Sequence, residues 1–215
     1  MAKIKLWGRR TSANVQKVVW ALEEIAADYE VEERGGRFGG LDDPEYRAMN
    51  PNALVPTIRD GDLTLWESSA IVRYLAAKYA EGSLFPTDPA QRAIVDQWAD
   101  WTNTRFQPAW IGVFWSAYRT RLEKQDKAAI AKTLAEAGKC FAILDRRLSE
   151  SPYLGGAGLT YADIIAGAGL FRWFTMPDIE RPDTPAVTAW YERLKERPGF
   201  RTGIMVDYTE LRWTI

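Results

Sequence analysis

Hydrophobic and polar residues follow two different patterns along this chain, and the pattern changes near residue 89. Residues 3–7 form a short apolar run bounded by Gly8, which predicts a buried strand. From Val15 to Ala27 the apolar residues recur at helical spacing. The alternation in "ADYEVEER", residues 27–34, predicts a second strand. The chain is therefore expected to begin with the order β, α, β.

The following residues predict a loop, a hairpin and a helix. Residues 35–56 are rich in Gly, Pro and Asn and predict a loop with one short helical turn. "TIRD" and "GDLTLW" predict a hairpin that turns at Asp60 and Gly61. "ESSAIVRYLAAKYA", residues 67–80, predicts a capped helix. We therefore expect an α/β domain over residues 1–80 and a linker over 81–88.

Beyond Pro89 the pattern predicts helices alone. A long helix over 90–119 is expected to be interrupted near Pro108, and a second helix covers 126–148. Further helices are expected over 159–174 and 184–200, and Thr160 and Asp163 have capping-box spacing at the start of the first of these. We therefore predict an all-helical domain over residues 89–215.

The charge of the chain argues against several classes of partner. Its 28 basic and 29 acidic residues leave a formal net charge of −1, with no long Lys/Arg cluster. No nucleic-acid or membrane partner is therefore expected. The start of the chain lacks the apolar stretch of a secretory signal, and no run reaches the ~20 apolar residues of a spanning helix. A cytoplasmic protein is expected.

The residue types restrict the chemistry further. The chain has no histidine and one cysteine, Cys140, which excludes an internal disulfide, a zinc cluster and any triad that needs imidazole. No metal site is expected. Cys140 lies in a helical stripe, so we expect a structural role. Any chemistry must use hydroxyls, amides, carboxylates or a thiol brought by a ligand.

Three stretches carry candidate chemistry, and each also has a simple structural reading. In "RRTSANVQK", residues 9–17, Ser12 or Asn14 is a typical helix N-cap. The alternative is that a hydroxyl and the free N–H groups of the helix start stabilise a thiolate there. In "NPNALVPTI" a cis Pro56 would leave the backbone of Val55 free to pair with a peptide, whereas a loop proline is ordinary. In "WESSAIVRYL" Ser68 could bind a carboxylate and Glu67 could accept from an ammonium. The alternative is that these two residues only cap the helix.

Together, in this order and spacing, the three stretches resemble the thioredoxin-like domain of the cytosolic glutathione transferases. The helical remainder resembles that family's second domain, so the resemblance covers essentially the whole chain. Position 12 matches the catalytic Ser, Thr or Cys of the bacterial and theta-like classes, and "SANVQK" resembles the Thr-Pro-Asn-x-x-Lys pattern of the nu-like group. The resemblance implies Ser12 as the first catalytic candidate and Asn14 as the second.

The resemblance also implies glutathione as cosubstrate. Val55 would pair with its cysteinyl backbone, and Glu67 with Ser68 would hold its γ-glutamyl end, while Thr160 and Asp163 would serve folding. The chain departs from the common "NPNGKVP" form at Ala53 and Leu54, so a cation is missing at Leu54 and Arg37 or Arg9 is expected to replace it. The glutathione-binding residues expected are Asn52, Leu54, Val55, Pro56, Glu67, Ser68 and Arg37.

A pocket for a small apolar electrophile is expected between the two domains. Ten tryptophans are present, several of them between Trp98 and Trp115, and they indicate either core packing or an aromatic pocket. A homodimer is expected, with the first domain of one chain on the helical domain of the other. The residues expected to line the pocket are Trp7, Phe114, Trp115, Tyr118 and Phe171, with Arg119 at the rim.

The expected activity is that of a glutathione transferase, which activates the glutathione thiol as a thiolate for attack on the electrophile. One alternative is a glutathione-dependent disulfide reductase or peroxidase. The other is a non-catalytic protein that keeps the glutathione-transferase fold for binding.

Overall fold

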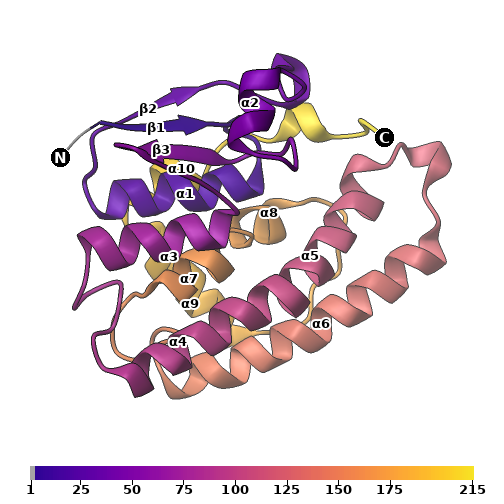
Figure 1. The fold of residues 1–215 in the computed structure, drawn as a ribbon. Coiled ribbons are helices and arrows are strands. Elements are labelled where there is room, and N and C mark those ends of the chain that lie inside the picture. The colour runs from indigo at the N-terminus through magenta and orange to yellow at the C-terminus, as the bar shows by residue number, and fades with distance from the viewer. Residues whose placement is uncertain (1–2) are drawn as a thin grey trace.

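The first domain is a four-stranded mixed sheet with helices on both faces (Figure 1). The computed structural model describes residues 3–215. The strand order is β2-β1-β3-β4, with β1 parallel to β2, β1 antiparallel to β3 and β3 antiparallel to β4. The elements are β1 (Ile4–Trp7), α1 (Ala13–Glu24), β2 (Tyr29–Glu32), η1 (Gly36–Phe38), α2 (Pro44–Met49), β3 (Thr57–Asp60), β4 (Leu63–Trp66) and α3 (Ser68–Tyr79). The predicted thioredoxin-like order is confirmed.

The two faces of this sheet are covered differently. Side chains alternate along a strand, so Ile4 and Leu6 of β1 point to one face, where they are fully buried against the core. Helices α1 and α3 lie on that face, and α2 lies on the other (Figure 1). Lys5 and Trp7 point to the α2 face, where the ammonium of Lys5 sits 4.9 Å from the centre of the Trp7 ring.

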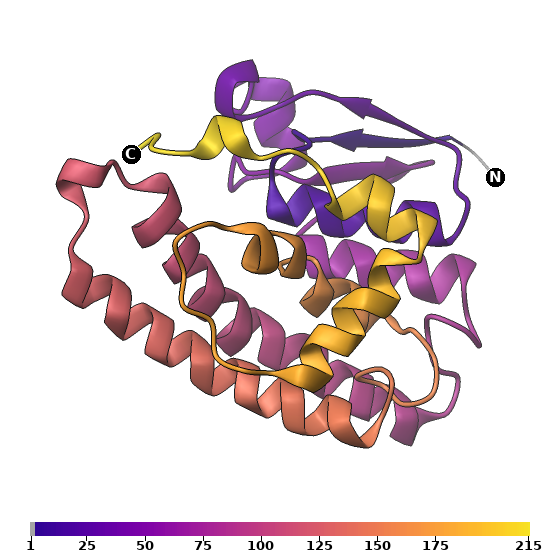
Figure 2. The same cartoon turned by 180° about the vertical axis from the view of Figure 1, so that it is seen from behind.

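The second domain is entirely helical over its described residues. Its first helices run beside α6 as an antiparallel pair, and the later helices fill the space between that pair and α1 and α3 (Figures 1 and 2). The elements are α4 (Pro89–Trp101), η2 (Thr102–Phe106), α5 (Gln107–Val113), η3 (Phe114–Arg119), η4 (Leu122–Lys124), α6 (Lys127–Glu150), α7 (Tyr161–Gly167), α8 (Leu170–Thr175), α9 (Pro185–Lys195), α10 (Pro198–Ile204) and η5 (Thr209–Leu211).

The predicted interruption near Pro108 is a change of helix type and not a break. The backbone stays helical from α4 to η3, and the segments η2 and η3 on either side of α5 are π-helical. Proline lacks an N–H and its ring crowds the carbonyl four residues earlier, here that of Thr104. The wider π turn over 102–106 removes that conflict, so the helix continues.

Two of the predicted helices are each divided in two. The helix expected over 159–174 separates into α7 and α8 at Gly169, where an added Cβ would lie 2.5 Å from the ring of Trp110. The helix expected over 184–200 ends at Lys195, and α10 starts afresh at Pro198, a residue suited to the first turn of a helix. Helix α10 then packs along α1 (Figure 2).

The contact between α1 and α10 joins the two domains. Trp20 of α1 is fully buried and meets the ring of Phe200 edge to face at 4.9 Å. Gly203 lies so close that an added Cβ would be 2.7 Å from the backbone nitrogen of Trp20. Glu24 at the end of α1 pairs with Arg197, with the closest N–O distance 2.6 Å. The position of α1 therefore depends on both domains.

The capping box predicted at Thr160 and Asp163 is confirmed. The carboxylate of Asp163 is fully buried and accepts from the backbone N–H of Leu154 at 2.8 Å, from that of Thr160 at 2.9 Å and from the Thr160 hydroxyl at 2.8 Å. Burial raises the pKa of Asp163 to about 6, against the hydrogen bonds that lower it. These bonds tie the loop before α7 to the start of that helix.

Replacing Asp163 by Ala should lower the free energy of unfolding by about 3 kcal/mol or more, because it leaves several buried donors unpaired at ~1–3 kcal/mol each. The matched control is Asp126→Ala, which removes the exposed cap of α6 that accepts from Ala128 and Ala129. The free energy of unfolding of Asp126→Ala should fall by about 1 kcal/mol. Urea unfolding of the two variants measures the difference, and equal losses would refute the tie between loop and helix.

Candidate active site

Ser12 is the N-cap of α1, and this role leaves its hydroxyl hydrogen available. The Ser12 hydroxyl oxygen accepts from the backbone N–H of Val15 at 3.5 Å, and the Ser12 backbone N–H donates to the carbonyl of Arg9 at 3.0 Å. A hydroxyl has one donor and two acceptor positions. Capping therefore occupies a lone pair, and Ser12 can still donate to a sulfur atom. The two readings of this residue do not exclude each other.

Asn14 is oriented by donors that surround its side-chain oxygen. The oxygen Oδ1 accepts from Lys17 Nζ at 3.2 Å, from Gln107 Nε2 at 3.1 Å and from Ser68 Oγ at 3.4 Å. This network assigns which end of the amide is oxygen. The amide NH₂ group is therefore directed away from these donors and can donate to a ligand.

Lys17 is buried beneath Asn14. Only 2% of the residue is exposed, and its ammonium donates to Asn14 and to the side-chain oxygen of Gln107. Burial lowers the pKa of Lys17 to about 7, and the charge of Glu67 opposes that shift. A cation thus lies below Asn14, and it loses its proton near neutral pH.

A polar cavity of about 380 Å³ lies at the N-terminus of α3. Glu67 precedes the helix with φ of 72° and ψ of 109°, a left-handed backbone that is uncommon outside glycine. Ser68 is nearly buried, and the Ser69 hydroxyl donates to Asn103 at 2.8 Å. The cavity is lined by Asn14, Lys17, Glu67, Ser68, Ser69, Ala70, Arg73, Asn103 and Gln107. Free backbone N–H groups at a helix start favour a carboxylate here.

The loop before β3 presents the backbone of Val55. The bond between Val55 and Pro56 is cis, as predicted. The carbonyl of Leu54 accepts from the Tyr46 hydroxyl at 2.6 Å and from the Asn50 amide at 2.8 Å. Within residues 3–215 no hydrogen bond engages the backbone of Val55, so its N–H and C=O can pair with an extended ligand. Asn52 is exposed, and its backbone N–H donates to Asn50 at 3.1 Å.

Arg37 and Arg9 are the two candidates for the cation that is missing at Leu54. Leu54 itself is 61% exposed. Arg37 reaches the carboxylate of Glu210 at 2.9 Å, so it joins the loop after β2 to the C-terminal segment. Arg9 lies against the turn at Gly36, where an added Cβ would be 2.8 Å from the Arg9 side chain. Both arginines therefore stay candidates, and only Arg37 is already ion-paired.

A smaller cavity of about 140 Å³ lies beside Ser12, between the domains. Phe114, Trp115 and Arg119, which the sequence predicts in the electrophile pocket, all line it, and all three come from η3. The Arg119 side chain is 5.0 Å from the centre of the Trp115 ring. The lining is Arg9, Thr11, Ser12, Ala13, Asn14, Ile111, Phe114, Trp115, Arg119, Arg172 and Leu211.

Tyr118 and Phe171, which the sequence also predicts in the electrophile pocket, do not line this cavity. Tyr118 is buried behind Phe114, with the two rings stacked at 5.2 Å, and it also contacts Tyr208 at 5.1 Å. Phe171 meets the edge of Tyr208 at 5.9 Å. These rings support the wall from behind, because Tyr208 lies between the cavity wall and the helical core.

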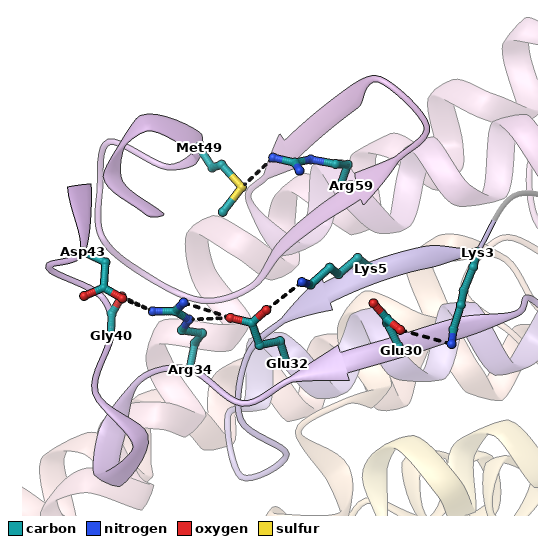
Figure 3. Close-up of polar contacts among 9 residues, drawn as sticks. All are labelled: Lys3, Lys5, Glu30, Glu32, Arg34, Gly40, Asp43, Met49 and Arg59. Atoms are coloured by element: carbon teal, nitrogen blue, oxygen red, sulfur yellow. Dashed lines mark hydrogen bonds and ion pairs between the residues drawn. The ribbon is translucent and has the colours of Figure 1, made fainter. Parts of the chain in front are cut away.

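Trp7, which is also expected to line the electrophile pocket, lies on the opposite face of the sheet from α1 and outside this cavity. Its ring contacts Lys5 and Arg59 and lines a separate surface cavity between the sheet and α2. The rim of that cavity carries ion pairs that join neighbouring segments (Figure 3). In them Glu32 of β2 pairs with Lys5 at 2.7 Å and with Arg34 at 2.9 Å. Trp7 therefore packs with side chains of β1 and β3 on the face that carries α2.

Several site residues carry no clear sequence signal. Gln107 lies on α5 and Asn103 on η2. The sequence marks Gln107 only as an amide next to Pro108, and Asn103 only as an amide within an aromatic-rich helix. Asn50, which holds the loop before β3, is part of the "NPNALVP" motif, whereas the sequence comparison within that motif points to Asn52. Arg172 and Leu211 reach the cavity from segments far along the chain, and nothing local marks either of them.

Three further observations concern the chemistry open to the chain. Within residues 3–215 no group of three or more Cys, Asp or Glu side chains is placed to hold a metal ion. No helix of the described chain is long and apolar enough to cross a membrane. Cys140 is half-buried on α6, and burial raises the pKa of its thiol. It lies in a groove between α5 and α6, apart from Ser12, and its structural role stays a prediction.

Comparisons with known proteins agree with this geometry. Residues 2–77 match the glutathione S-transferase N-terminal domain, and residues 102–198 match the glutathione S-transferase C-terminal domain. Glutathione S-transferase GstB of Escherichia coli is 40% identical over 205 residues, covering 94% of this chain and 98% of that protein. Glutathione S-transferase 3 of Zea mays is 34% identical over 208 residues, covering 94% and 93%. The theta class enzyme of Xanthomonas axonopodis pv. citri, solved with glutathione bound, is 47% identical with a TM-score of 0.91, covering 96% and 99%.

The depressed pKa of Lys17 predicts how stability depends on pH. Between pH 7 and the ordinary value of 10.5 the unfolded chain holds a proton that the folded chain has lost, so this group makes the fold more stable as pH rises. Lys17→Met removes the amine, so its free energy of unfolding should exceed that of the wild type most at pH 6. This difference in the free energy of unfolding should shrink by about 2.7 kcal/mol between pH 6 and pH 9, at ~1.4 kcal/mol per unit.

Urea unfolding at pH 6 and pH 9 measures this change. Lys124→Met removes one positive charge from an exposed position and serves as the control, with no change of comparable size. Parallel pH profiles for wild type and Lys17→Met would show that the Lys17 ammonium keeps its ordinary proton affinity.

Proposed function

Because this chain belongs to the glutathione S-transferase family and has glutathione S-transferase activity, we propose that Ser12 and Asn14 together hold the glutathione sulfur as a thiolate. The thiolate attacks a small electrophile in the cavity beside Phe114 and Trp115. The relative from Xanthomonas axonopodis pv. citri was solved with glutathione bound. Glutathione is accordingly the cosubstrate.

The observation that carries this proposal is the position of Asn14, which lines both cavities. The polar cavity contains Glu67 and Ser68, which suit the ammonium and carboxylate of the γ-glutamyl end. The free backbone of Val55 suits the middle of the tripeptide. A glutathione molecule anchored at these groups places its thiol next to Asn14 and Ser12, at the entrance of the second cavity.

The chemistry asked of the two residues is modest. A charge-assisted hydrogen bond contributes about 1.5–3 kcal/mol, which lowers the pKa of a bound thiol by about one to two units. Ser12 donates its hydroxyl hydrogen and Asn14 its amide hydrogen, while the helix N-terminus adds a favourable dipole. No protein nucleophile is needed, so the lack of histidine in the sequence is no obstacle.

The test is the pKa of glutathione bound to Ser12→Ala and to Asn14→Ala, read from the ultraviolet absorbance of the thiolate against pH. Each variant should raise this pKa and lower turnover about tenfold or more, since ~1.4 kcal/mol is one power of ten. Asp88→Ala removes the cap of α4, whose carboxylate accepts from Gln91 at 2.8 Å. This control should lose stability and keep the thiol pKa. Unchanged pKa values in both site variants would refute the assignment.

A homodimer in the cytoplasm belongs to the same proposal. Edge strand β4 exposes Leu63 and Trp66, at 40% and 37%, which suits burial against the helical domain of a second chain. A reduced glutathione pool is a property of the cytoplasm. Light scattering at micromolar concentration should give twice the mass of one chain, and Trp66→Lys should shift it toward the monomer. A monomeric wild type would refute the dimer.

A further inference from the structure

The cavity beside Ser12 is walled by three guanidinium groups from three separate segments. Arg9 comes from the loop between β1 and α1, Arg119 from the end of η3 and Arg172 from α8. Part of the remaining wall is apolar, with the aromatic side chains of Phe114 and Trp115, and the polar groups of Ser12 and Asn14 complete it. The pocket for the second substrate thus combines three cationic groups with an aromatic surface.

Arg172 is the most unusual of the three because it is buried. The residue is 5% exposed, and its Nη2 donates to the carbonyl of Thr11 at 2.8 Å and to Gln16 at 3.3 Å. Its guanidinium lies 5.0 Å from the centre of the Phe114 ring. The buried Nε has no hydrogen-bond partner among the described residues. A buried donor of this kind is costly unless a ligand completes it.

The charges around Arg172 do not cancel. Within residues 3–215 no carboxylate lies within ion-pair distance of Arg9, Arg119 or Arg172. Burial, opposed by Tyr208 and aided by the charges of Arg9 and Arg119, lowers the pKa of Arg172 to about 10. The group is still protonated at neutral pH.

Glu210 and Glu33 are the carboxylates whose charges act on Arg9, and Glu210 is already engaged. Glu210 accepts from the Thr11 hydroxyl at 2.8 Å and pairs with Arg37. Burial raises the pKa of the Tyr118 phenol on the inner side, so this phenol carries no charge at neutral pH. The cavity therefore keeps an excess of positive charge that the chain itself does not balance.

We propose that the electrophile this enzyme conjugates carries an anionic group, a carboxylate or a sulfonate, which binds to Arg172 and Arg119 while its reactive carbon faces the sulfur beside Ser12. The inference rests on the proposed function of that site. It narrows the substrate class from small apolar electrophiles to organic acids with an apolar or aromatic body. The body contacts Phe114 and Trp115, and the acid group pairs with the guanidinium charges of Arg172 and Arg119.

A matched pair of aryl chlorides tests this preference. In 4-chloro-3-nitrobenzoate the thiolate sulfur bonds to the carbon that bears chlorine, chloride leaves with the electron pair of the broken bond, and the thiol proton goes to solvent. 4-Chloro-3-nitrobenzamide reacts in the same way without the charge. We expect kcat/KM, divided by the uncatalysed rate of each compound with glutathione, to be at least about tenfold higher for the benzoate, the effect of one charge-assisted hydrogen bond.

Three variants locate the anion site. Arg119→Gln and Arg172→Gln should each reduce the ratio of benzoate to benzamide by about tenfold. The ratio cancels any damage common to both substrates, including a shift of the Thr11 carbonyl in the Arg172 variant. Arg121→Gln removes an exposed arginine two residues from Arg119 and should keep the wild-type ratio. Turnover of the benzamide with no preference for the benzoate would overturn the inference and leave the proposed function intact.

A binding measurement separates the two proposals. Calorimetry with 3-nitrobenzoate, which cannot react, in saturating S-methylglutathione should show binding that weakens about tenfold in Arg119→Gln and not in Arg121→Gln. Binding without any conjugation of either aryl chloride would refute the thiol activation and not the anion site. A raised KM for glutathione in the two arginine variants, with an unchanged substrate ratio, would instead assign these arginines to the glutathione carboxylate and overturn the inference.

Discussion

The burial of helix α1 is the constraint on which the rest of the structure depends. The sheet covers one side of the helix and α10 the other, and Trp20 fills the contact so closely that Gly203 has no room for a side chain. Well-packed interiors of this kind move little. The start of α1, with Ser12 and Asn14, is therefore held relative to both domains at once. A site that must align groups from two domains gains its precision from this packing.

The fold was largely predictable because each element has a local cause. Four local signals act over only a few residues each. They are the apolar run over residues 3–7, the alternation over 27–34, the turn at Asp60 and Gly61, and the capping box at Thr160 and Asp163. The errors lie where a local pattern competes with packing. Pro108 was expected to interrupt its helix, but a π turn accommodates it. Pro198 was expected inside a helix, but it begins one.

In the candidate site, too, the residues in local motifs were easier to predict than those that distant segments bring together. The residues expected to bind glutathione lie in short motifs, and the structure places Ser12, Asn14, Glu67 and Ser68 around two adjoining cavities. The electrophile pocket was harder, because Arg172 and Leu211 arrive from distant segments and carry no motif. Trp7 lies outside the cavity for a different reason. Its place on β1 is local, but the face to which it points depends on strand register, and one residue of difference reverses that face.

The C-terminal segment gives the cavity one of its walls, and this fixes the order in which the enzyme is completed during synthesis. Glu210 bonds to Thr11, Leu211 lines the cavity and the backbone of Ile215 pairs with that of Arg119 and Arg121. Domains usually fold from the N-terminal end as the chain emerges from the ribosome. The loop at Val55 and the start of α3 are thus translated well before Leu211, which lies far later in the sequence. Under the proposed function, a nascent chain has the groups for holding glutathione before it has an enclosed place for the second substrate.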